Sequence, residues 1–157
     1  MTVTLRLNGQ EATLDCAPSD MLAPTLRAAG LTSVRETCRI GVCGSCTVLL
    51  DGEPVSGCLT MAGQAAGREV TTVEGLGGTD PVQRAFVDAR AFQCGWCTPG
   101  FVLTVKRLLE ERDGGAGGDE LTDGEIAEAL GGNLCRCGSY VKIGDAVRRA
   151  HSERKAG

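Results

Sequence analysis

Four cysteines in the first half of the chain have the spacing of iron–sulfur ligands. They form the pattern Cys38-x4-Cys43-x2-Cys46-x11-Cys58. A C-x4-C-x2-C run with a fourth cysteine further on is typical of plant-type [2Fe–2S] sites. Two irons bridged by two sulfides need four thiolates around an elongated rhomb, so one loop can supply three and a separate segment the fourth. Gly41 and Gly44 lie inside this loop, where they allow the backbone to approach the inorganic sulfides closely.

A structural zinc ion is the alternative for this first set. Zinc also binds four cysteines, but they usually come from two C-x2-4-C knuckles. Here three of the candidate ligands lie in one loop. The spacing therefore favours iron–sulfur over zinc.

A second set of four cysteines lies in the other half of the chain. It consists of two pairs, Cys94-x2-Cys97 and Cys135-x-Cys137. Each pair directly precedes a predicted helix, where free N–H groups and the helix dipole favour anionic thiolates. Taken alone, this set could also bind zinc. Next to a [2Fe–2S] site, two redox centres in series are the better interpretation.

The remaining residues that could do chemistry are few. We expect the ninth cysteine, Cys16, to be a small buried apolar side chain rather than a reactive thiol. The single histidine, His151, is expected to be a solvated residue at a helix end rather than a ligand or base. The sequence contains no G-x-G-x-x-G motif, Walker loop or Ser–His–Asp set. These patterns predict an electron carrier without a substrate-converting site.

Composition and charge restrict the partners and the compartment. The 157 residues carry a net charge of −4, with a pI of about 5.0, which argues against nucleic acid or an anionic membrane as partner. The basic residues 148, 149, 154 and 155 are expected to form a helix C-terminus followed by a solvated tail. No apolar run approaches the roughly 20 residues of a membrane span, and residues 1–9 do not resemble a signal peptide. We therefore expect a cytoplasmic protein, in which spaced cysteines indicate metal rather than disulfides.

The first half of the sequence predicts a small mixed sheet with one packed helix. Residues 2–7 and 11–15 alternate as strands around Asn8-Gly9-Gln10, and residues 47–50 and 54–55 do so around Asp51-Gly52. Another β-prone run covers 69–73. Residues 20–29 favour a helix that Ser19 or Asp20 could cap and Gly30 could end.

The second half predicts four helices and no strand. Asp80-Pro81 and Thr98-Pro99 are start signals for the first two helices. A glycine-rich loop follows at 114–118, and Thr122 with Glu125 forms a capping box for a helix that ends at Gly131-Gly132. The last helix is expected from about Tyr140 to His151. The composition changes near 75–80, where we expect a domain boundary.

Three cysteine-containing segments resemble one known family. Residues 36–48 (ETCRIGVCGSCTV), 93–100 (QCGWCTPG) and 132–140 (GNLCRCGSY) closely resemble the iron–sulfur subunit of the xanthine dehydrogenase family of molybdenum hydroxylases. This family includes carbon monoxide dehydrogenase, aldehyde oxidoreductases, and quinoline- and isoquinoline-type oxidoreductases. The resemblance extends from the first strand to about Arg149 and includes all eight paired cysteines. One departure is Trp96, at a position where phenylalanine is commoner.

The resemblance implies an α+β fold and two cluster-binding domains. An N-terminal β-grasp, ferredoxin-like domain would cover 1–76, and an all-α four-helix-bundle [2Fe–2S] domain would cover 77–157. In this family, electrons leave a molybdenum–pterin cofactor on a large subunit. They pass through the C-terminal cluster and then the N-terminal cluster, usually to FAD on a medium subunit.

The same resemblance implies roles for individual residues. Gln93 matches a glutamine that contacts the pterin, and Cys137 matches the ligand nearest the pterin amine. The family implies an oxidoreductase that assembles as a hetero-oligomer, as a dimer of heterotrimers. Two other hypotheses stay open at this point: a zinc-stabilised interaction module and a free-standing two-cluster ferredoxin.

Overall fold

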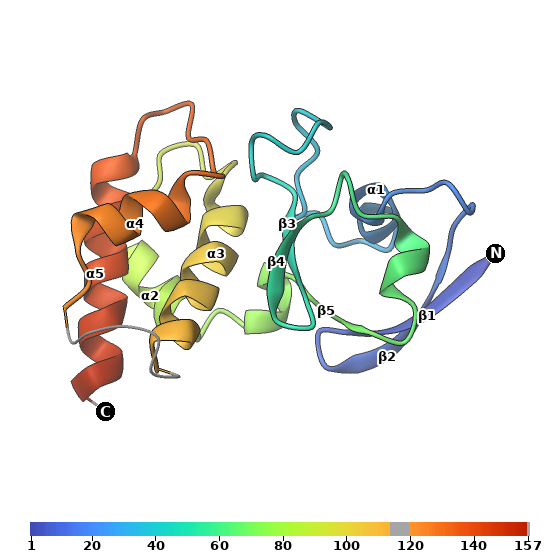
Figure 1. The fold of residues 1–157 in the computed structure, drawn as a ribbon, viewed down its shortest axis with the longest axis horizontal. Helices are drawn as coiled ribbons and strands as arrows, with labels where there is room; N and C mark the ends of the chain where they lie inside the picture. Colours follow the sequence, from blue (N-terminus) through green and yellow to red (C-terminus); the bar gives the residue numbers. More distant parts are fainter. Residues whose placement is uncertain (114–119, 157) are drawn as a thin grey trace.

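The computed structural model describes residues 1–113 and 120–156. A sheet with one helix forms one side of the molecule and the later helices form the other (Figure 1). The predicted glycine-rich loop at 114–118 lies outside the described residues. None of the helices described is long and apolar enough to cross a bilayer.

The sheet contains five strands: β1 (Thr2–Leu7), β2 (Gln10–Asp15), β3 (Thr47–Leu50), β4 (Glu53–Ser56) and β5 (Glu69–Thr71). Their order is β2-β1-β5-β3-β4, with β1 and β5 parallel and the other neighbours antiparallel. Both predicted hairpins are confirmed. In each two-residue turn, Asn8-Gly9 and Asp51-Gly52, both residues have positive φ, as the turns that match strand twist require.

The helix α1 (Leu22–Ala28) covers one face of this sheet. Its Leu22 and Leu26 are fully buried in a core that also contains Val3, Val48 and Val70. Burial of such side chains contributes roughly 1.5–3 kcal/mol each, so this core fixes the sheet that carries the first cysteine set.

The ends of α1 correct one prediction and confirm another. Met21 occupies the N-cap position, and its side chain makes no hydrogen bond that caps the helix. Asp20 does not cap the helix, because its carboxylate accepts the Ala17 N–H at 2.7 Å. At the other end Gly30, with φ of +92°, donates to Arg27 O at 3.0 Å, and this left-handed C′ residue ends the helix as predicted.

Two short 3₁₀ helices, η1 (Ala62–Ala65) and η2 (Val73–Leu76), flank β5. The predicted strand at 69–73 therefore ends earlier, at Thr71. Val73 and Leu76 pack against the core of the later helices, so η2 leads the chain from the sheet into the helical part.

Four α-helices follow: α2 (Pro81–Asp88), α3 (Thr98–Glu111), α4 (Asp123–Leu130) and α5 (Tyr140–Ala156). Within the described part of this half there is no strand, as predicted. Asp80 caps α2 by accepting the Val82 N–H at 2.9 Å, and the Thr122–Glu125 capping box is present. One apolar core joins these helices, and it includes Phe86, Phe101 and Ile143.

The last helix differs from the prediction in two respects. It continues to Ala156, so Arg154 and Lys155 belong to its last turn and not to a solvated tail. His151 is buried, with 8% exposure, rather than solvated. The cause is the same: because the helix continues past residue 151, His151 lies within it, one turn beyond the buried Val147.

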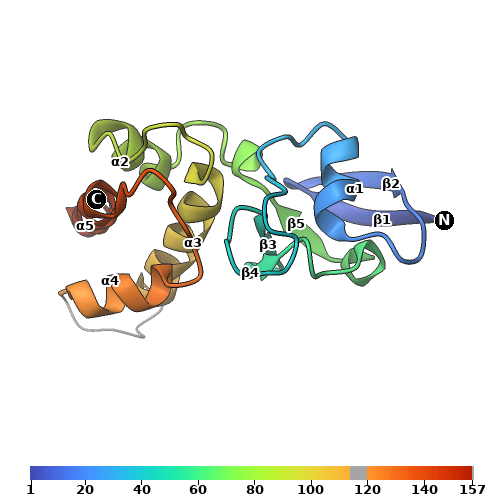
Figure 2. The same ribbon diagram turned by 90° about the horizontal axis from the view of Figure 1, so that it is seen from above.

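The helix α3 lies between the sheet and the other helices, as Figure 2 shows from above. It contacts β3 and β4 as well as α2 and α4. Leu49 of β3 points to the opposite face from Val48 and Leu50, and it is buried, as is Leu103 of α3. Arg107 of α3 binds Glu53 of β4 at 2.6 Å. These contacts hold α3 against the strands β3 and β4.

Candidate metal centres

The segments that carry the paired cysteines meet on one side of the molecule. The loop between α1 and β3, the loop between α2 and α3, and the loop between α4 and α5 all lie at the upper edge in Figure 1. α3 and α5 both begin at this edge. All nine cysteines are free thiols.

The first set is brought together as two pairs. The Cys43 side chain helps to lower the pKa of Cys38, and the Cys58 side chain helps to raise the pKa of Cys46, so the members of each pair lie close together. Cys43 and Cys46 are close enough to interact electrostatically, which links the pairs. Cys43, Cys46 and Cys58 are buried, whereas Cys38 is partly exposed.

The loop around the first set points backbone N–H groups at sulfur. The N–H of Ile40 is the main cause that lowers the pKa of Cys38 to about 6, and the N–H groups of Cys43 and Val42 add to it. The turn depends on positive φ at Arg39 (57°) and Gly41 (77°). Such amide groups stabilise an anionic thiolate and the negative charge of a cluster.

The second set is also assembled as two pairs. The Cys137 side chain helps to lower the pKa of Cys94, and the Cys135 side chain helps to raise the pKa of Cys97, so the members of each pair lie close together. Cys97 is the N-cap of α3, one residue before the predicted cap Thr98, which is the first residue of the helix. The carbonyl of Ser139 accepts the Ile143 N–H in the first turn of α5, at 2.9 Å. Both pairs thus lie at helix N-termini, as predicted.

Burial and backbone amides act in opposite directions on several of these thiols. Burial raises the pKa of Cys46 and of Cys97 to about 12. The N–H of Trp96 lowers the pKa of Cys94. Burial also opposes ionisation of Cys135, but the Ser139 N–H, 3.4 Å from its Sγ, and other hydrogen bonds lower its pKa overall. The Cys46 and Cys97 sulfurs therefore need a cation if they are to be thiolates.

The arrangement of each cysteine set as two pairs suits a cluster with two irons. Among residues 1–113 and 120–156, no group of three or more His, Cys, Asp or Glu side chains is placed to hold a metal ion. In a [2Fe–2S] rhomb each iron takes two thiolates, so two linked pairs are the donor set that it needs.

Comparisons with known proteins agree with this geometry. Residues 72–148 match the family described as "[2Fe-2S] binding domain", and residues 26–97 match "2Fe-2S iron-sulfur cluster binding domain". The "Nicotinate dehydrogenase small FeS subunit" of Eubacterium barkeri is 44% identical over 154 residues, which is 96% of this chain and 94% of that protein. The "Xanthine dehydrogenase iron-sulfur-binding subunit" of Escherichia coli O157:H7 is 40% identical, covering 94% and 92%. The chain belongs to this family of small iron–sulfur subunits of xanthine dehydrogenase-type molybdenum hydroxylases.

Solved structures support the same assignment. Quinoline 2-oxidoreductase from Pseudomonas putida 86 has a TM-score of 0.89 at 37% identity, covering 100% of this chain and 97% of that chain. The aldehyde oxidoreductase from Desulfovibrio desulfuricans ATCC 27774 has a TM-score of 0.88 at 37% identity, and 17% of that chain is covered. This protein is therefore an oxidoreductase iron–sulfur subunit with an electron-transfer role.

The two residues that the resemblance placed at the pterin lie together in this iron–sulfur subunit. Gln93 Nε2 donates to the carbonyl oxygen of Cys137 at 3.3 Å, and Gln93 is exposed. The hydrogen bond joins the α2–α3 loop to the α4–α5 loop. A partner that contacts one of these residues can thus reach the other.

Two buried hydroxyls beside the second set give a further test of the fit to a cluster. Within the described residues, Thr98 Oγ1 and Ser139 Oγ have no hydrogen-bond partner. Thr98 directly follows Cys97, and Ser139 lies two residues beyond Cys137. A buried hydroxyl without a partner is costly. Sulfur acceptors of a cluster would satisfy both groups.

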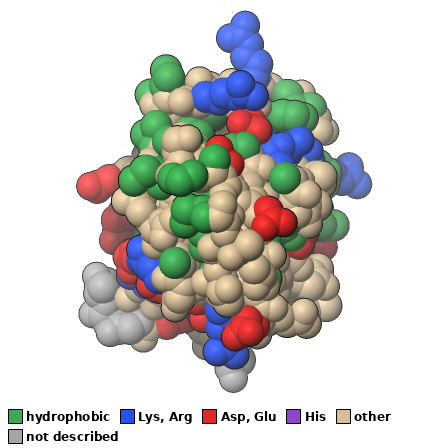
Figure 3. Space-filling view, turned by 90° about the vertical axis from the view of Figure 1, so that its right-hand side faces the viewer, with side chains coloured by type: hydrophobic (Ala, Val, Ile, Leu, Met, Phe, Trp, Pro, Cys, Tyr) green, Lys and Arg blue, Asp and Glu red, His purple; other side chains and the backbone are tan. Residues whose placement is uncertain are grey.

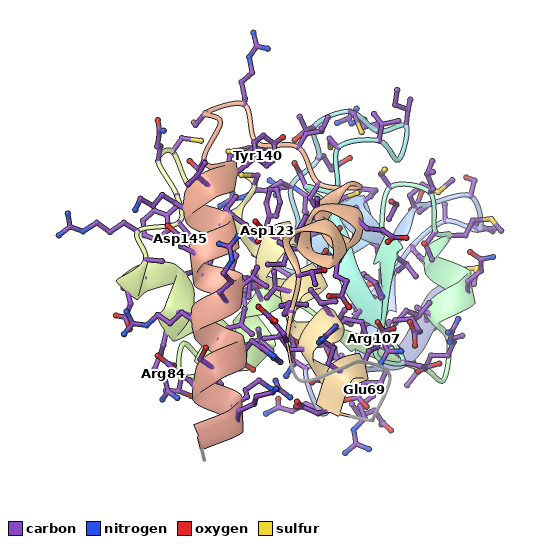
Figure 4. All side chains as sticks on the ribbon, turned by 60° about the vertical axis from the view of Figure 1, so that its left-hand side comes forward. Glu69, Arg84, Arg107, Asp123, Tyr140 and Asp145 are labelled. Atoms are coloured by element: carbon purple, nitrogen blue, oxygen red, sulfur yellow. The ribbon has the colours of Figure 1, made fainter. Side chains whose placement is uncertain are left out.

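Contacts between the cysteine-bearing loops were not predicted from the sequence. Trp96 Nε1 donates to Thr37 Oγ1 at 2.8 Å, and the Arg35 guanidinium lies 4.7 Å from the Trp96 ring centroid. The Cys135 N–H donates to Tyr140 Oη at 2.8 Å, and Figure 4 shows Tyr140 at the upper end of α5. In the sequence, Trp96 stands out as a departure from phenylalanine, and its indole N–H is the signal that indicates a polar partner.

Exposed apolar side chains accompany both sets. Ile40 and Val42 lie inside the first loop, and Leu59 follows Cys58; these three are 56–67% exposed. Figure 3 shows hydrophobic side chains gathered in the upper part of the sheet end of the molecule. Near the second set, Trp96 and Leu134 are about half exposed. Apolar surface of this kind is typical of protein interfaces.

Proposed function

We propose that this subunit holds two [2Fe–2S] clusters and relays electrons between a molybdenum–pterin site on a large subunit and FAD on a medium subunit. The proposed ligands are Cys38, Cys43, Cys46 and Cys58 for the first cluster, and Cys94, Cys97, Cys135 and Cys137 for the second. The observation that carries the proposal is the assembly of each set as two linked thiol pairs. Each cluster, when bound, accepts and releases one electron at a time.

The thiol contacts also support an assignment of ligands to individual irons. In the first set, Cys38 with Cys43 would hold one iron, and Cys46 with Cys58 the other. In the second set, the same reasoning pairs Cys94 with Cys137 and Cys97 with Cys135. The chain's own part is to hold these thiolates, to direct amide N–H groups at them, and to exclude water from the buried members.

The two ends of the relay differ in their surroundings. The exposed Gln93, bonded to Cys137, supports a contact with the pterin of the large subunit at the second set. The exposed apolar residues around the first set support a contact with the flavin subunit. We propose a cytoplasmic hetero-oligomer, arranged as a dimer of heterotrimers, with substrate conversion on the large subunit.

The finer fold description is part of the same proposal. The strand order β2-β1-β5-β3-β4 with one helix on the sheet supports a β-grasp, ferredoxin-like domain over 1–76. The helices α2 to α5 with their common core support a four-helix bundle over 77–157. The boundary at 76/77 stays a prediction, and η2, which packs on the helical core, is the segment at which it would be drawn.

Metal analysis with single-ligand variants tests the proposal. We expect about four irons per chain in the intact protein, and about two in Cys46→Ala and in Cys135→Ala, each of which should lose a different EPR signal after reduction. Cys16→Ala is the matched control and should keep about four irons, since Cys16 lies outside both sets. A colourless protein that binds zinc, or fewer than about four irons after careful reconstitution, would overturn the proposal.

A partner test addresses the relay. The holoenzyme purified through this subunit should contain a molybdenum-binding chain and a flavin-binding chain. Gln93→Ala should keep its iron while the second cluster's EPR signal responds less to the oxidation state of molybdenum. A stable monomer that is fully competent in electron transfer would instead favour a free-standing ferredoxin.

A further inference from the structure

The two cysteine sets are joined by a direct backbone hydrogen bond. The N–H of Leu134 donates to the carbonyl oxygen of Cys43 at 3.0 Å. Cys43 belongs to the first set, and Leu134 directly precedes Cys135 of the second set. A single hydrogen bond therefore connects a ligand of the first set with the residue next to a ligand of the second set.

Asn133, the residue before Leu134, holds the same two loops together with its side chain. Its Nδ2 donates to the Gly44 carbonyl oxygen at 3.2 Å. Its Oδ1 lies 3.1 Å from the Thr104 hydroxyl, which shares its proton between this oxygen and Gly100 O at 3.0 Å. Asn133 is buried, with 5% exposure. A buried amide with a donor and an acceptor both engaged is fixed in one orientation.

Two glycines make the close approach of the loops possible. A Cβ on Gly100, in the first turn of α3, would lie 2.2 Å from Gly44 O. A Cβ on Gly44 would lie 2.4 Å from Asn133 Nδ2 and 2.5 Å from Gly132 O, and the φ of Gly44 is +65°. Both positions therefore need glycine, and the contact surface between the loops has no room for a side chain.

We infer that Asn133 is a positioning residue that sets the separation, and hence the electronic coupling, of the two cluster sites. The inference rests on the proposed function, because it requires both clusters. Asn133 touches no cysteine thiol; it acts through Gly44, which lies next to Cys43, and through Leu134, which lies next to Cys135. If the hydrogen bond from Asn133 Nδ2 to Gly44 O is lost, the bond from the Leu134 N–H to Cys43 O has to hold these two loops together by itself, so the loops can separate.

Asn133→Asp is the sharpest variant for a test. The carboxylate has nearly the same shape and can still accept from Thr104, but it cannot donate to Gly44 O. The readout is the EPR spectrum of the fully reduced holoprotein, in which spin–spin interaction between two nearby clusters splits the signals. We expect unchanged iron content, a reduced splitting, and severalfold slower electron equilibration between the clusters after flash reduction.

A matched control is Asn8→Asp in the turn between β1 and β2. Asn8 is likewise bonded through both amide atoms, to the Thr72 hydroxyl at 3.1 Å and from the Thr72 N–H at 2.8 Å. Its replacement should lower stability but leave the splitting unchanged. A general loosening of the fold would therefore be distinguished from a change at the contact between the loops.

A milder pair of variants keeps the test decisive if Asn133→Asp does not fold. Thr104→Val removes the hydroxyl that orients the amide, and Thr104→Ser restores it. We expect a smaller loss of splitting in the valine variant and recovery in the serine variant. The inference would be overturned if the parent protein holds both clusters but its EPR signals show no splitting. It would also be overturned if the Asn133 and Thr104 variants hold both clusters and show the same splitting as the parent. An intact protein without two clusters would overturn the proposed function instead.

Discussion

Ser139 lies where the second cysteine set meets α5. Its backbone N–H donates to Cys135 Sγ at 3.4 Å, and its carbonyl oxygen accepts the Ile143 N–H at 2.9 Å. Its hydroxyl is buried and, in the described part of the chain, has no partner at hydrogen-bond geometry, although it lies near enough to Cys135 to help lower the pKa of that thiol. A hydrogen bond to cluster sulfur stabilises the more negative, reduced form, and such bonds are one of the means by which proteins set cluster potentials.

The Ser139→Ala variant should therefore lower the reduction potential of one cluster. We expect the second cluster to shift and the first to keep its potential, because Ser139 contacts only the second set. An EPR-monitored potentiometric titration measures both values in one experiment. Ser152→Ala, which removes an exposed hydroxyl of α5 that is bonded to Arg148 O at 3.0 Å, is the control. Equal potentials in the parent and the Ser139 variant would contradict this prediction.

Cys16 is the one cysteine outside both sets. It is 8% exposed and belongs to the core between the sheet and α1, as expected for a small apolar side chain. Cys16→Ala should keep the full iron content and lower the free energy of unfolding by about 1 kcal/mol. Iron analysis and urea denaturation check these two outcomes. A loss of iron would show that this thiol has a role in cluster binding.

Ligand residues could be predicted from the sequence because iron–sulfur ligation is encoded in short spacings. The C-x4-C-x2-C run and the two C-x-x-C and C-x-C pairs are local patterns. The role of Asn133 could not be predicted in this way, since its partner Gly44 is 89 positions away. The contact of Trp96 with Thr37 spans 59 positions. Only the fold brings such residues together.

The N-terminus of α4 depends on one carboxylate. Glu125 accepts the backbone N–H of Thr122 at 2.8 Å and its hydroxyl at 2.7 Å, and Arg112 donates to it at 2.6 Å. The Thr122 hydrogen bonds, followed by Arg112, lower the pKa of Glu125 to about 2. This capping box therefore requires the ionised carboxylate.

The pH dependence of stability should reflect this carboxylate. Its pKa is lower in the folded protein than in the unfolded chain, so its contribution is complete above about pH 5 and is lost as the pH falls toward about 2. Glu125→Gln should be less stable than the parent at neutral pH and should lose less stability over that acidic range. Urea unfolding at a series of pH values measures the difference. Parallel curves for the two proteins would contradict the assignment.

The C-terminal end of α5 could not be predicted from the local sequence pattern. The prediction ended the helix near His151, yet neither Gly nor Pro follows until Gly157. Arg154 and Lys155 are good helix formers that also suit the negative end of the helix dipole. Arg154 Nε also bonds Asp113 Oδ2 at 2.8 Å. This long-range ion pair, 41 positions apart, supports a turn that the local pattern left open.

The helix α3 joins the sheet to the helices of the second half of the chain. Two kinds of contact act at this junction. Arg107 and Glu53 form an ion pair at 2.6 Å, in which the Glu53 side chain is 59% exposed; Figure 4 shows Arg107 on the lower part of α3. Leu103, on the same helix, is 1% exposed. Exposed ion pairs contribute little, whereas a buried leucine contributes more.

The apolar contact should therefore dominate the stability of the junction. We expect Leu103→Ala to lower the free energy of unfolding by about 2–5 kcal/mol, and Glu53→Gln to change it by less than about 1 kcal/mol. Because α3 also carries Gly100 and Thr104, which contact Gly44 and Asn133, the leucine variant should weaken the interaction between the two clusters while the glutamine variant leaves it intact. Urea unfolding and EPR of the reduced protein measure the two effects. A Glu53→Gln variant as unstable as Leu103→Ala would mean that the ion pair, and not the buried face of α3, holds the two cysteine sets in register.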